Sequence, residues 1–360
     1  MKKAMKKLMA ALLAVAMVCA MAIPAFAEGT GASAGAAAAD TTYTITINNP
    51  VGSYEAYQIF SGDLEGNVLS NIKWGTGVSA DGQTHFGDAK DKAAALNNSN
   101  VKDFAEEVSS YLATPSGTYA AGKITGLSAG YYLVKNSLVG EHETYTSFIL
   151  KVVQDVDVTP KGDTPSLEKK VKDINDTTDD TTSSWQDSAD HDIGDKVPFQ
   201  LTAKIASNFD DYKTYKFVFH DVQSAGLDFL ENTVKVKVGN TELTSDQYKV
   251  ITTGLDDDCT FHVVIEDLKK IDSAAADAKV VVEYESKLNT SAVIGSKGNP
   301  NEAYLEYSNN PYDTHGTTTT PHDKVTVFTF KVVANKIDGA TKEKLPGAAF
   351  ALYKKDYNGI

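Results

Sequence analysis

The sequence predicts an all-β protein made of tandem β-sandwich domains, with a small helical insertion in the first of them. Two observations carry this prediction. Apolar residues occur mainly in short runs or in strict alternation with polar residues, which is the pattern of buried and half-buried strands. Residues that favour turns separate these runs at intervals that suit a sandwich.

The N-terminus has the composition of a secretory signal peptide. Four lysines precede the apolar residues 8–21, and Ala25, Phe26 and Ala27 form the small-x-small pattern that a signal peptidase recognises. The apolar run is shorter than the ~20 residues that a membrane span needs. We therefore expect a signal peptide over residues 1–27, cleavage after Ala27, a disordered lead over residues 28–41 and a secreted protein.

The mature chain is strongly acidic. The formal net charge of −14 becomes −18 when the signal peptide takes away four lysines and no acidic residue. The sequence also has no arginine, so it cannot bind phosphate through a bidentate guanidinium group. Both facts argue against nucleic acid or anionic lipid as a partner. Because Cys19 leaves with the signal peptide, Cys259 cannot form an internal disulfide.

Residues 42–160 form the predicted first domain. Residues 42–47 alternate strictly, with Tyr43, Ile45 and Ile47 on one face. Residues 51–60, 130–134 and 147–153 are predicted as further strands. Residues 89–111 break the alternation and place apolar side chains at helical spacing, so one or two helices are expected there.

A linker and a second sandwich follow. Residues 158–165 contain two prolines and a glycine, which is typical of a linker. The predicted second domain covers residues 161–324, with loops at 175–184 and 313–323. Its predicted strands are residues 166–171, 197–205, 215–221, 233–238, 261–265, 280–284 and 303–307.

The last part of the chain predicts the start of a third domain. Residues 324–336 contain no turn residue and are predicted as one strand of roughly 40 Å that crosses a domain border. The third domain then covers residues 325–360, far fewer than the ~100 residues that such a sandwich needs. We therefore expect this domain to be truncated and the chain to be a fragment.

Three polar residues of the second domain share a strand face with apolar side chains. They are Lys169, Asp221 and Asn309, and the alternation of strand side chains predicts that all three point inward. Burying a charged group alone costs several kcal/mol. One interpretation is that each lies at a strand end and reaches water. A β-bulge would select Lys170 or Asn310 instead.

A lysine, an aspartate and an asparagine that converge in a core can react with one another. Burial disfavours the charged forms of the amine and of the acid. The neutral amine can then attack the side-chain carbonyl of the asparagine while the acid polarises it and transfers protons. Ammonia leaves, and the fold supplies the proximity that this slow reaction needs. The product is a Lys–Asn isopeptide bond.

Several stretches of the sequence resemble the sortase-assembled major pilins of Gram-positive bacteria. This resemblance implies immunoglobulin-like sandwiches of the Cna type B kind. In the segment that is similar to the pilin motif, Thr159 stands where a tyrosine is usual. The stretches that carry the resemblance are residues 53–60 with 72–75, 152–161, 185–199, 220–227, 307–311 and 335–353.

The resemblance implies a role for individual residues. Lys161 would be the amine that a pilus-specific sortase joins to the preceding subunit. Lys169 and Asn309 would be the crosslinked pair, with Asp221 as the catalytic acid. Lys336 would be the crosslinking lysine of the third domain.

The implied function is that of a structural backbone subunit of a cell-surface pilus that supports adhesion. Its partners would be other copies of itself, the sortase, peptidoglycan through the sortase, minor pilins and host surface ligands. The sorting signal for wall anchoring would lie beyond Ile360. The alternative is an adhesin, either at a pilus tip or not polymerised at all. Lys161 distinguishes the two, because only the shaft subunit needs an acceptor lysine.

No turnover enzyme, cofactor or metal site is expected from the sequence. The only predicted chemistry is intramolecular and occurs once per molecule. The seven histidines show no metal-ligand spacing. Asp256, Asp257 and Asp258 are predicted to form a tight acidic turn, because consecutive positions do not converge on one ion as spaced ligands do.

Overall fold

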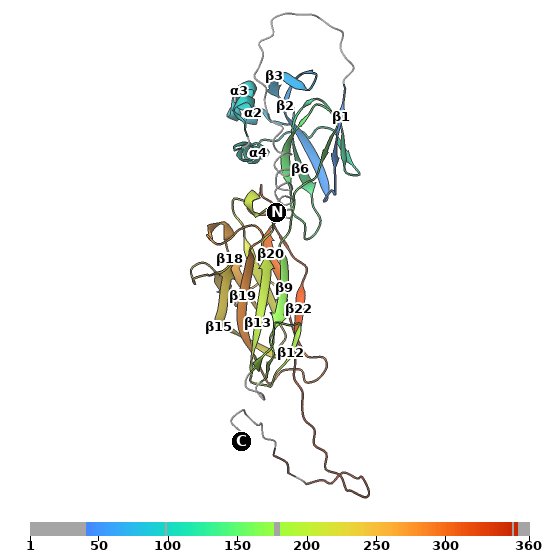
Figure 1. Ribbon diagram of the computed structural model, residues 1–360, viewed down its shortest axis with the longest axis vertical. Coiled ribbons are helices and arrows are strands. Elements are labelled where there is room, and N and C mark those ends of the chain that lie inside the picture. Colours follow the sequence, from blue (N-terminus) through green and yellow to red (C-terminus); the bar gives the residue numbers. More distant parts are fainter. Residues whose placement is uncertain (1–40, 98, 176–180, 348, 352–360) are drawn as a thin grey trace, which may run out of the picture. The chain divides into compact units, whose positions relative to one another are not determined.

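The computed structural model describes residues 41–97, 99–175, 181–347 and 349–351 (Figure 1). The predicted signal peptide, its cleavage after Ala27 and residues 28–40 of the predicted lead lie outside these ranges. In the described part, no helix is long and apolar enough to cross a membrane. The chain divides into two compact units between Asp163 and Thr164, and the short segment Asn309–Asp313 belongs to the first unit.

The first unit contains two four-stranded sheets whose facing sides share one apolar core. One sheet has the strand order β4-β5-β1-β8 and the other β3-β2-β6-β7. The strands are β1 (Tyr43–Ile47), β2 (Ser53–Glu65), β3 (Val68–Trp74), β4 (Thr118–Ala120), β5 (Lys123–Leu127), β6 (Gly130–Leu138), β7 (Ser147–Val152) and β8 (Val156–Val158).

Three helices cover the second face of the β3-β2-β6-β7 sheet. They are α2 (Ala80–Phe86), α3 (Ala89–Ala95) and α4 (Val101–Ser109), and Figure 1 shows them grouped beside β2 and β3. Ile59 and Leu133 pack against Phe104 in this second core. The predicted helical insertion is therefore confirmed, although it begins earlier than residue 89. The sheet is covered on both faces, which explains why five consecutive residues of β2, 56–60, are buried.

The second unit is a sandwich of two larger sheets. One has the order β16-β15-β19-β13-β9, and Figure 1 shows β15, β19, β13 and β9 side by side. The other has the order β12-β22-β20-β14-β18-β17, with β21 paired to β20. The strands of the first sheet are β9 (Ser166–Val171), β13 (Lys196–Lys204), β15 (Leu227–Val238), β16 (Thr241–Glu242) and β19 (Lys279–Leu288).

The second sheet supplies the other half of the core. Its strands are β12 (Ser188–Asp190), β14 (Phe217–Gln223), β17 (Lys249–Ile251), β18 (Phe261–Ile265), β20 (Asn299–Ser308), β21 (Thr317–Thr319) and β22 (Asp323–Phe328). Two short strands, β10 (Ile174–Asn175) and β11 (Thr181–Thr182), pair with each other, and η1 (Phe209–Asp211) and η2 (Leu268–Lys270) are single 3₁₀ turns. Alternating residues of both sheets meet in a single aromatic-rich core.

The strand prediction for the second unit is largely confirmed. Each of the seven predicted strands overlaps an observed one, and residues 166–171 and 261–265 match β9 and β18 along their whole length. The predicted loops need correction, because residues 313–323 contain β21, and β10 and β11 fall within 175–184 or at its border.

The long strand predicted over residues 324–336 is wrong in its length. β22 ends at Phe328, and it pairs with both β20 and β12. Val325 and Val327 are buried in the core of the second unit, so the predicted domain border at residue 325 cuts through this sandwich. Beyond it, Phe330 and Val332 are exposed and lie in no described strand. The strand ends at Phe328, the last residue of β22 that pairs with a neighbouring strand.

Candidate functional site

Lys169 is fully buried in the core of the second unit. It lies on β9 opposite Leu201 of β13, and its side chain is 0% exposed. Its ammonium nitrogen lies 5.7 Å from the ring centre of Phe199 and 5.6 Å from that of Tyr284. The predicted inward direction of Lys169 is thus correct. The adjacent Lys170 faces the other way, and its Nζ lies 2.6 Å from a carboxylate oxygen of Asp187.

Asp221 meets Lys169 from the opposite sheet. It lies on β14, its side chain is 0% exposed, and its Oδ2 accepts a hydrogen bond of 2.5 Å from Lys169 Nζ. The hydroxyl of Tyr284, on β19, donates to the same oxygen over 2.7 Å. The sandwich therefore brings together two of the three residues that the sequence pattern selected.

An asparagine completes this group, and it is Asn301. Asn301 lies on β20, is 0% exposed, and its Nδ2 donates to the Tyr284 hydroxyl over 2.9 Å. Lys169 Nζ donates to the same hydroxyl over 3.0 Å. Tyr284 Oη thus accepts from both nitrogens while its own proton goes to Asp221, which uses the full capacity of a phenol.

The prediction that Asn309 is the partner of Lys169 needs correction. Asn309 lies just past the end of β20, and its side-chain amide donates to the backbone carbonyl of Glu143 within the first unit. At ~3.3 Å per residue, it stands roughly 26 Å along the chain from Asn301. Alternation placed Asn309 on the correct face, but its position along the strand lies far from Lys169. Its neighbour Asn310 lines a hollow of the first unit, so Asn310 does not join the buried group of Lys169 either.

Burial changes the protonation of this group. It lowers the pKa of the Lys169 amine, although the Asp221 carboxyl beside it opposes that shift. Burial also raises the pKa of Asp221, against the opposing effect of Lys169. The pKa of Tyr284 is raised well above its usual value by burial and by Asp221. The environment therefore favours a neutral amine, a protonated acid and a protonated phenol.

Two polar atoms of the group, Asp221 Oδ1 and Asn301 Oδ1, lack a hydrogen-bond partner among the described residues. Each buried polar atom without a partner costs on the order of 1–3 kcal/mol. Protonation of Asp221 would turn its carboxyl into a hydrogen-bond donor inside this group. The group holds a nucleophilic amine, a carboxylic acid and an amide carbonyl, which are the parts that amide exchange requires.

The other predicted site residues do not belong to this buried group. Lys161 is exposed and lies between β8 and β9, in the segment that joins the two units. Lys336 is exposed, and its backbone carbonyl accepts a hydrogen bond from the Leu345 amide. Neither position is buried as Lys169 is.

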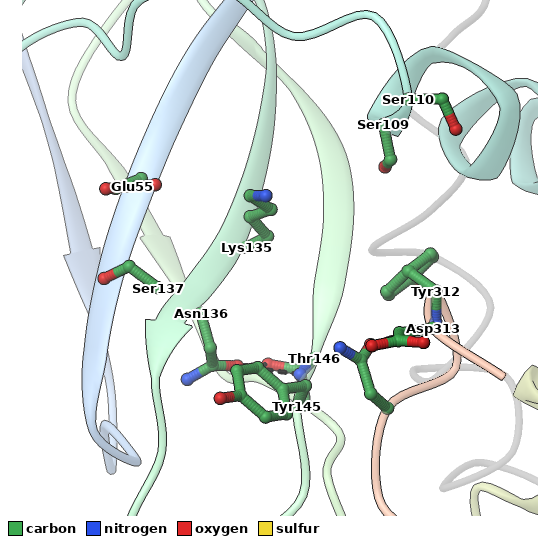
Figure 2. A pocket seen from close by; sticks show the side chains of 11 residues that line it. Glu55, Ser109, Ser110, Lys135, Asn136, Ser137, Tyr145, Thr146, Tyr312 and Asp313 are labelled. Carbon is green, nitrogen blue, oxygen red and sulfur yellow. Dashed lines mark hydrogen bonds between the residues drawn. The ribbon is translucent and has the colours of Figure 1, made fainter. Parts of the chain in front are cut away.

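A polar hollow in the first unit provides no comparable chemistry. It lies among β2, β6, the end of α4 and the segment Asn309–Asp313, and Figure 2 shows Lys135 on one side with Tyr312 and Asp313 on the other. Its lining is mostly hydroxyl and amide groups. The candidate site of this chain is therefore the buried group Lys169, Asp221, Tyr284 and Asn301.

Comparisons with known proteins agree with this architecture. Residues 193–311, which include Asp221, Tyr284 and Asn301, match the family model of the Gram-positive pilin backbone subunit 2, Cna-B-like domain. The trypsin-resistant surface T6 protein of Streptococcus pyogenes serotype M6 is 25% identical over 358 residues, covering 87% of this chain and 63% of the relative. The chain thus spans less than two thirds of the length of that relative.

Solved structures of pilins are similar to this chain, and the T6 backbone pilin shows the same fold. The T6 backbone pilin of serotype M6 Streptococcus pyogenes has a TM-score of 0.55 at 19% identity, covering 84% of this chain and 67% of that chain. The full-length major pilin SpaD of Corynebacterium diphtheriae has a TM-score of 0.48 at 18% identity, covering 85% and 70%. The resemblance stated from the sequence is confirmed: residues 193–311 match a Gram-positive pilin backbone Cna-B-like domain, and the chain is similar to the T6 protein over 87% of its length.

Proposed function

We propose that this chain is a backbone subunit of a covalently polymerised pilus, and that its second unit forms an isopeptide bond between Lys169 and Asn301. The observation that carries the crosslink is the buried hydrogen-bonded group in which Tyr284 contacts Lys169, Asp221 and Asn301. The homology to backbone pilins supports the role in a pilus.

The reaction begins with a proton arrangement that burial favours. Lys169 is neutral and Asp221 carries a proton, so neither group bears a charge that the core would have to solvate. The lone pair of Lys169 Nζ attacks Cγ of Asn301, while Asp221 donates its proton to the carbonyl oxygen. The negative charge that would form on this oxygen is thereby neutralised within the buried core.

The second half of the reaction returns the proton. Asp221, now a carboxylate, takes a proton from the attacking nitrogen and passes it to the leaving Nδ2. The bond between Cγ and Nδ2 breaks as the carbonyl re-forms and returns its proton to Asp221. One C–N bond forms, one C–N bond breaks, and one ammonia leaves. The chain consumes its own side chains, so it acts once and is not a turnover enzyme.

Tyr284 positions the reactants. Its hydroxyl holds the amine of Lys169 at 3.0 Å and the amide nitrogen of Asn301 at 2.9 Å. Because the pKa of this phenol is raised by burial, it stays protonated and keeps its donor bond to Asp221. Aromatic packing fixes the ring, since Phe199 stacks on it at 5.3 Å and Phe261 meets its edge at 5.0 Å.

The polymer itself would form through Lys161. Its exposure in the segment between the two units would let a pilus-specific sortase bring it to the activated C-terminus of another copy. The partners proposed are therefore further copies of this chain, the sortase, minor pilins and, through the sortase, peptidoglycan. The proposed location is the pilus on the cell wall, where the shaft would support adhesion to host ligands.

Intact-mass spectrometry of the purified chain tests the crosslink. The expected mass is lower than that of the processed sequence by one ammonia, and peptide mapping should join Lys169 to Asn301. Asp221→Ala and Asn301→Ala should each restore the missing mass. Asn309→Ala is the matched control and should keep the loss. Full mass in the wild type after long incubation, or a bond that survives Asn301→Ala, would overturn the proposal.

A further inference from the structure

A second group of chemically active side chains lies on the outer face of the seven-stranded sheet of the second unit. His220 of β14 and His262 of β18 are direct cross-strand partners, and their rings lie 4.0 Å apart. Asp257 and Cys259 come from the loop that joins β17 to β18. One ligand atom from each of these four residues lies within 4.8 Å of the others.

The four ligand atoms have the spacing of a small tetrahedral site. Asp257 Oδ2 lies 3.0 Å from His220 Nδ1 and 2.9 Å from His262 Nε2, and Cys259 Sγ lies 3.7 Å from His220 Nδ1. A tetrahedral zinc ion, with bonds of about 2.0–2.3 Å, holds its ligand atoms roughly 3.3–3.7 Å apart. Small shifts of these side chains would admit the ion.

The surroundings of His220 favour a metal ligand. While Nδ1 faces the group, Nε2 lies 3.4 Å from a carboxylate oxygen of Glu306. Metal-bound histidines commonly place the second ring nitrogen against a carboxylate in this way, which fixes the tautomer and orients the ring. Glu306 is itself held by Lys216 at 2.9 Å, and Tyr304 stacks on His220 at 4.4 Å.

The group is enclosed yet reachable. The side chains of His220 and His262 are 10% and 11% exposed, although both point away from the core of the sandwich. The loop that carries Asp257 and Cys259 covers them, and Asp257 keeps 26% exposure. An ion could therefore enter from solvent past the carboxylate.

We propose that His220, Asp257, Cys259 and His262 bind one Zn²⁺ ion with tetrahedral geometry. Two imidazoles, a thiolate and a carboxylate form a set of donors that suits zinc, whereas calcium and magnesium prefer oxygen alone. The ion would fasten the β17–β18 loop to β14 and would keep the single cysteine of the mature chain coordinated. This site was not expected from the sequence, because strand pairing, and not local spacing, brings the two histidines together.

Metal binding by tag-free protein tests the site. The purified chain is equilibrated with zinc, freed of loosely bound metal and analysed for zinc per chain, and Co²⁺ serves as the spectroscopic probe. One zinc per chain is expected, with the intense visible bands of tetrahedral cobalt and a thiolate-to-cobalt charge-transfer band. Cys259→Ser should remove the charge-transfer band and weaken zinc binding at least tenfold, and His262→Gln should weaken it similarly.

His322→Gln is the matched control. His322 stacks on Tyr304 beside the group but contributes no ligand atom, so this variant should bind zinc as the wild type does. A second measurement needs no variant: zinc should slow the alkylation of Cys259 at least tenfold in the wild-type chain. Substoichiometric zinc, octahedral cobalt bands, or unchanged alkylation would overturn the proposal and leave a purely hydrogen-bonded cluster.

Discussion

Lys169 and Asn301 share one hydrogen-bond partner, the hydroxyl of Tyr284. The two nitrogens come from opposite sheets and lie within two hydrogen-bond lengths of each other. Asp221 accepts from both the lysine and the tyrosine, so four buried side chains form one connected group. The covalent bond that we propose would replace part of this polar group with a neutral amide and would release one nitrogen from the core.

Loss of the crosslink should lower the stability of the second unit. Lys169 and Asn301 are separated by well over one hundred residues, and closing a loop of this length by a disulfide stabilises a fold by about 5 kcal/mol. Asn301→Ala should therefore reduce the free energy of unfolding of this unit by about that amount. Denaturation followed by Trp185 fluorescence in a Trp74→Phe background reports on the second unit alone, since the sequence has two tryptophans.

The control for this measurement is Asn309→Ala. Asn309 donates to the Glu143 carbonyl and takes no part in the buried group, so its loss should leave the unfolding of the second unit within about 1 kcal/mol of wild type. Equal destabilisation by the two variants would mean that the crosslink does not contribute to the free energy of unfolding of the second unit.

Removing the lysine should make stability depend on pH in a defined direction. In Lys169→Met the crosslink cannot form, and Asp221 stays buried, which raises its pKa above the ordinary value of 3.8. Folding must then take up a proton at any pH between 3.8 and the raised folded-state pKa. Stability is fully present below that pH and falls as pH rises, by at most 1.36 kcal/mol per unit, until the folded-state pKa is passed.

Urea unfolding of Lys169→Met at a series of pH values from 4 upward measures this slope. The double variant Lys169→Met with Asp221→Asn carries no titrating acid at this position and should lack it. Parallel pH profiles for the two proteins would show that Asp221 is solvated in the folded chain.

Polymerisation should require Lys161. Coexpression of the complete subunit with its cognate sortase should give ladders of high mass on a denaturing gel, and Lys161→Ala should abolish them. Lys123→Ala, which removes an exposed lysine from β5, should leave the ladders intact. Ladders that persist in Lys161→Ala would place the acceptor elsewhere, and a chain that never polymerises would favour the adhesin alternative.

Lys336 should remain unmodified in the 360-residue chain. It is exposed, and no buried acid or asparagine accompanies it in the part of the chain that the structure describes. Peptide mapping should recover Lys336 with a free side chain. A crosslink from Lys336 to any residue present would show that it already belongs to a reactive site.

Alternation along strands correctly predicted which side chains point inward. It did not predict which position along the strand lies opposite Lys169. Asn299, Asn301 and Asn309 all share the parity of Leu305, so the pattern alone could not choose among them. The choice depends on register: Asp221 pairs with Ala303 and Gln223 with Asn301 across β14 and β20. Register is set by pairing with a distant strand and by the turns between them, which a local pattern does not contain.

The border of the second unit was missed for a related reason. Residues 324–336 have a uniform strand-like composition, and only the pairing of β22 with β20 and β12 decides that the strand ends at Phe328. The same holds for Tyr284, whose hydroxyl completes the buried group although nothing near it in the sequence indicates a polar role. Local sequence patterns therefore predict which face of a strand is buried, whereas the pairing of distant strands decides which residues contact one another.

The position of β22 has a mechanical consequence. A crosslink between β9 and β20 would carry tension directly from the first strand of the unit to Asn301, and it would shield every strand between them. β22 follows β20 and lies outside this covalent path, held by ladders to β20 and β12. A pull between Lys161 and the chain beyond Phe328 could therefore extend only the residues outside the closed loop, 162–168 and 302–328, to a length of at most about 120 Å. The unit would yield as a short extensible tether attached to a rigid, inextensible body.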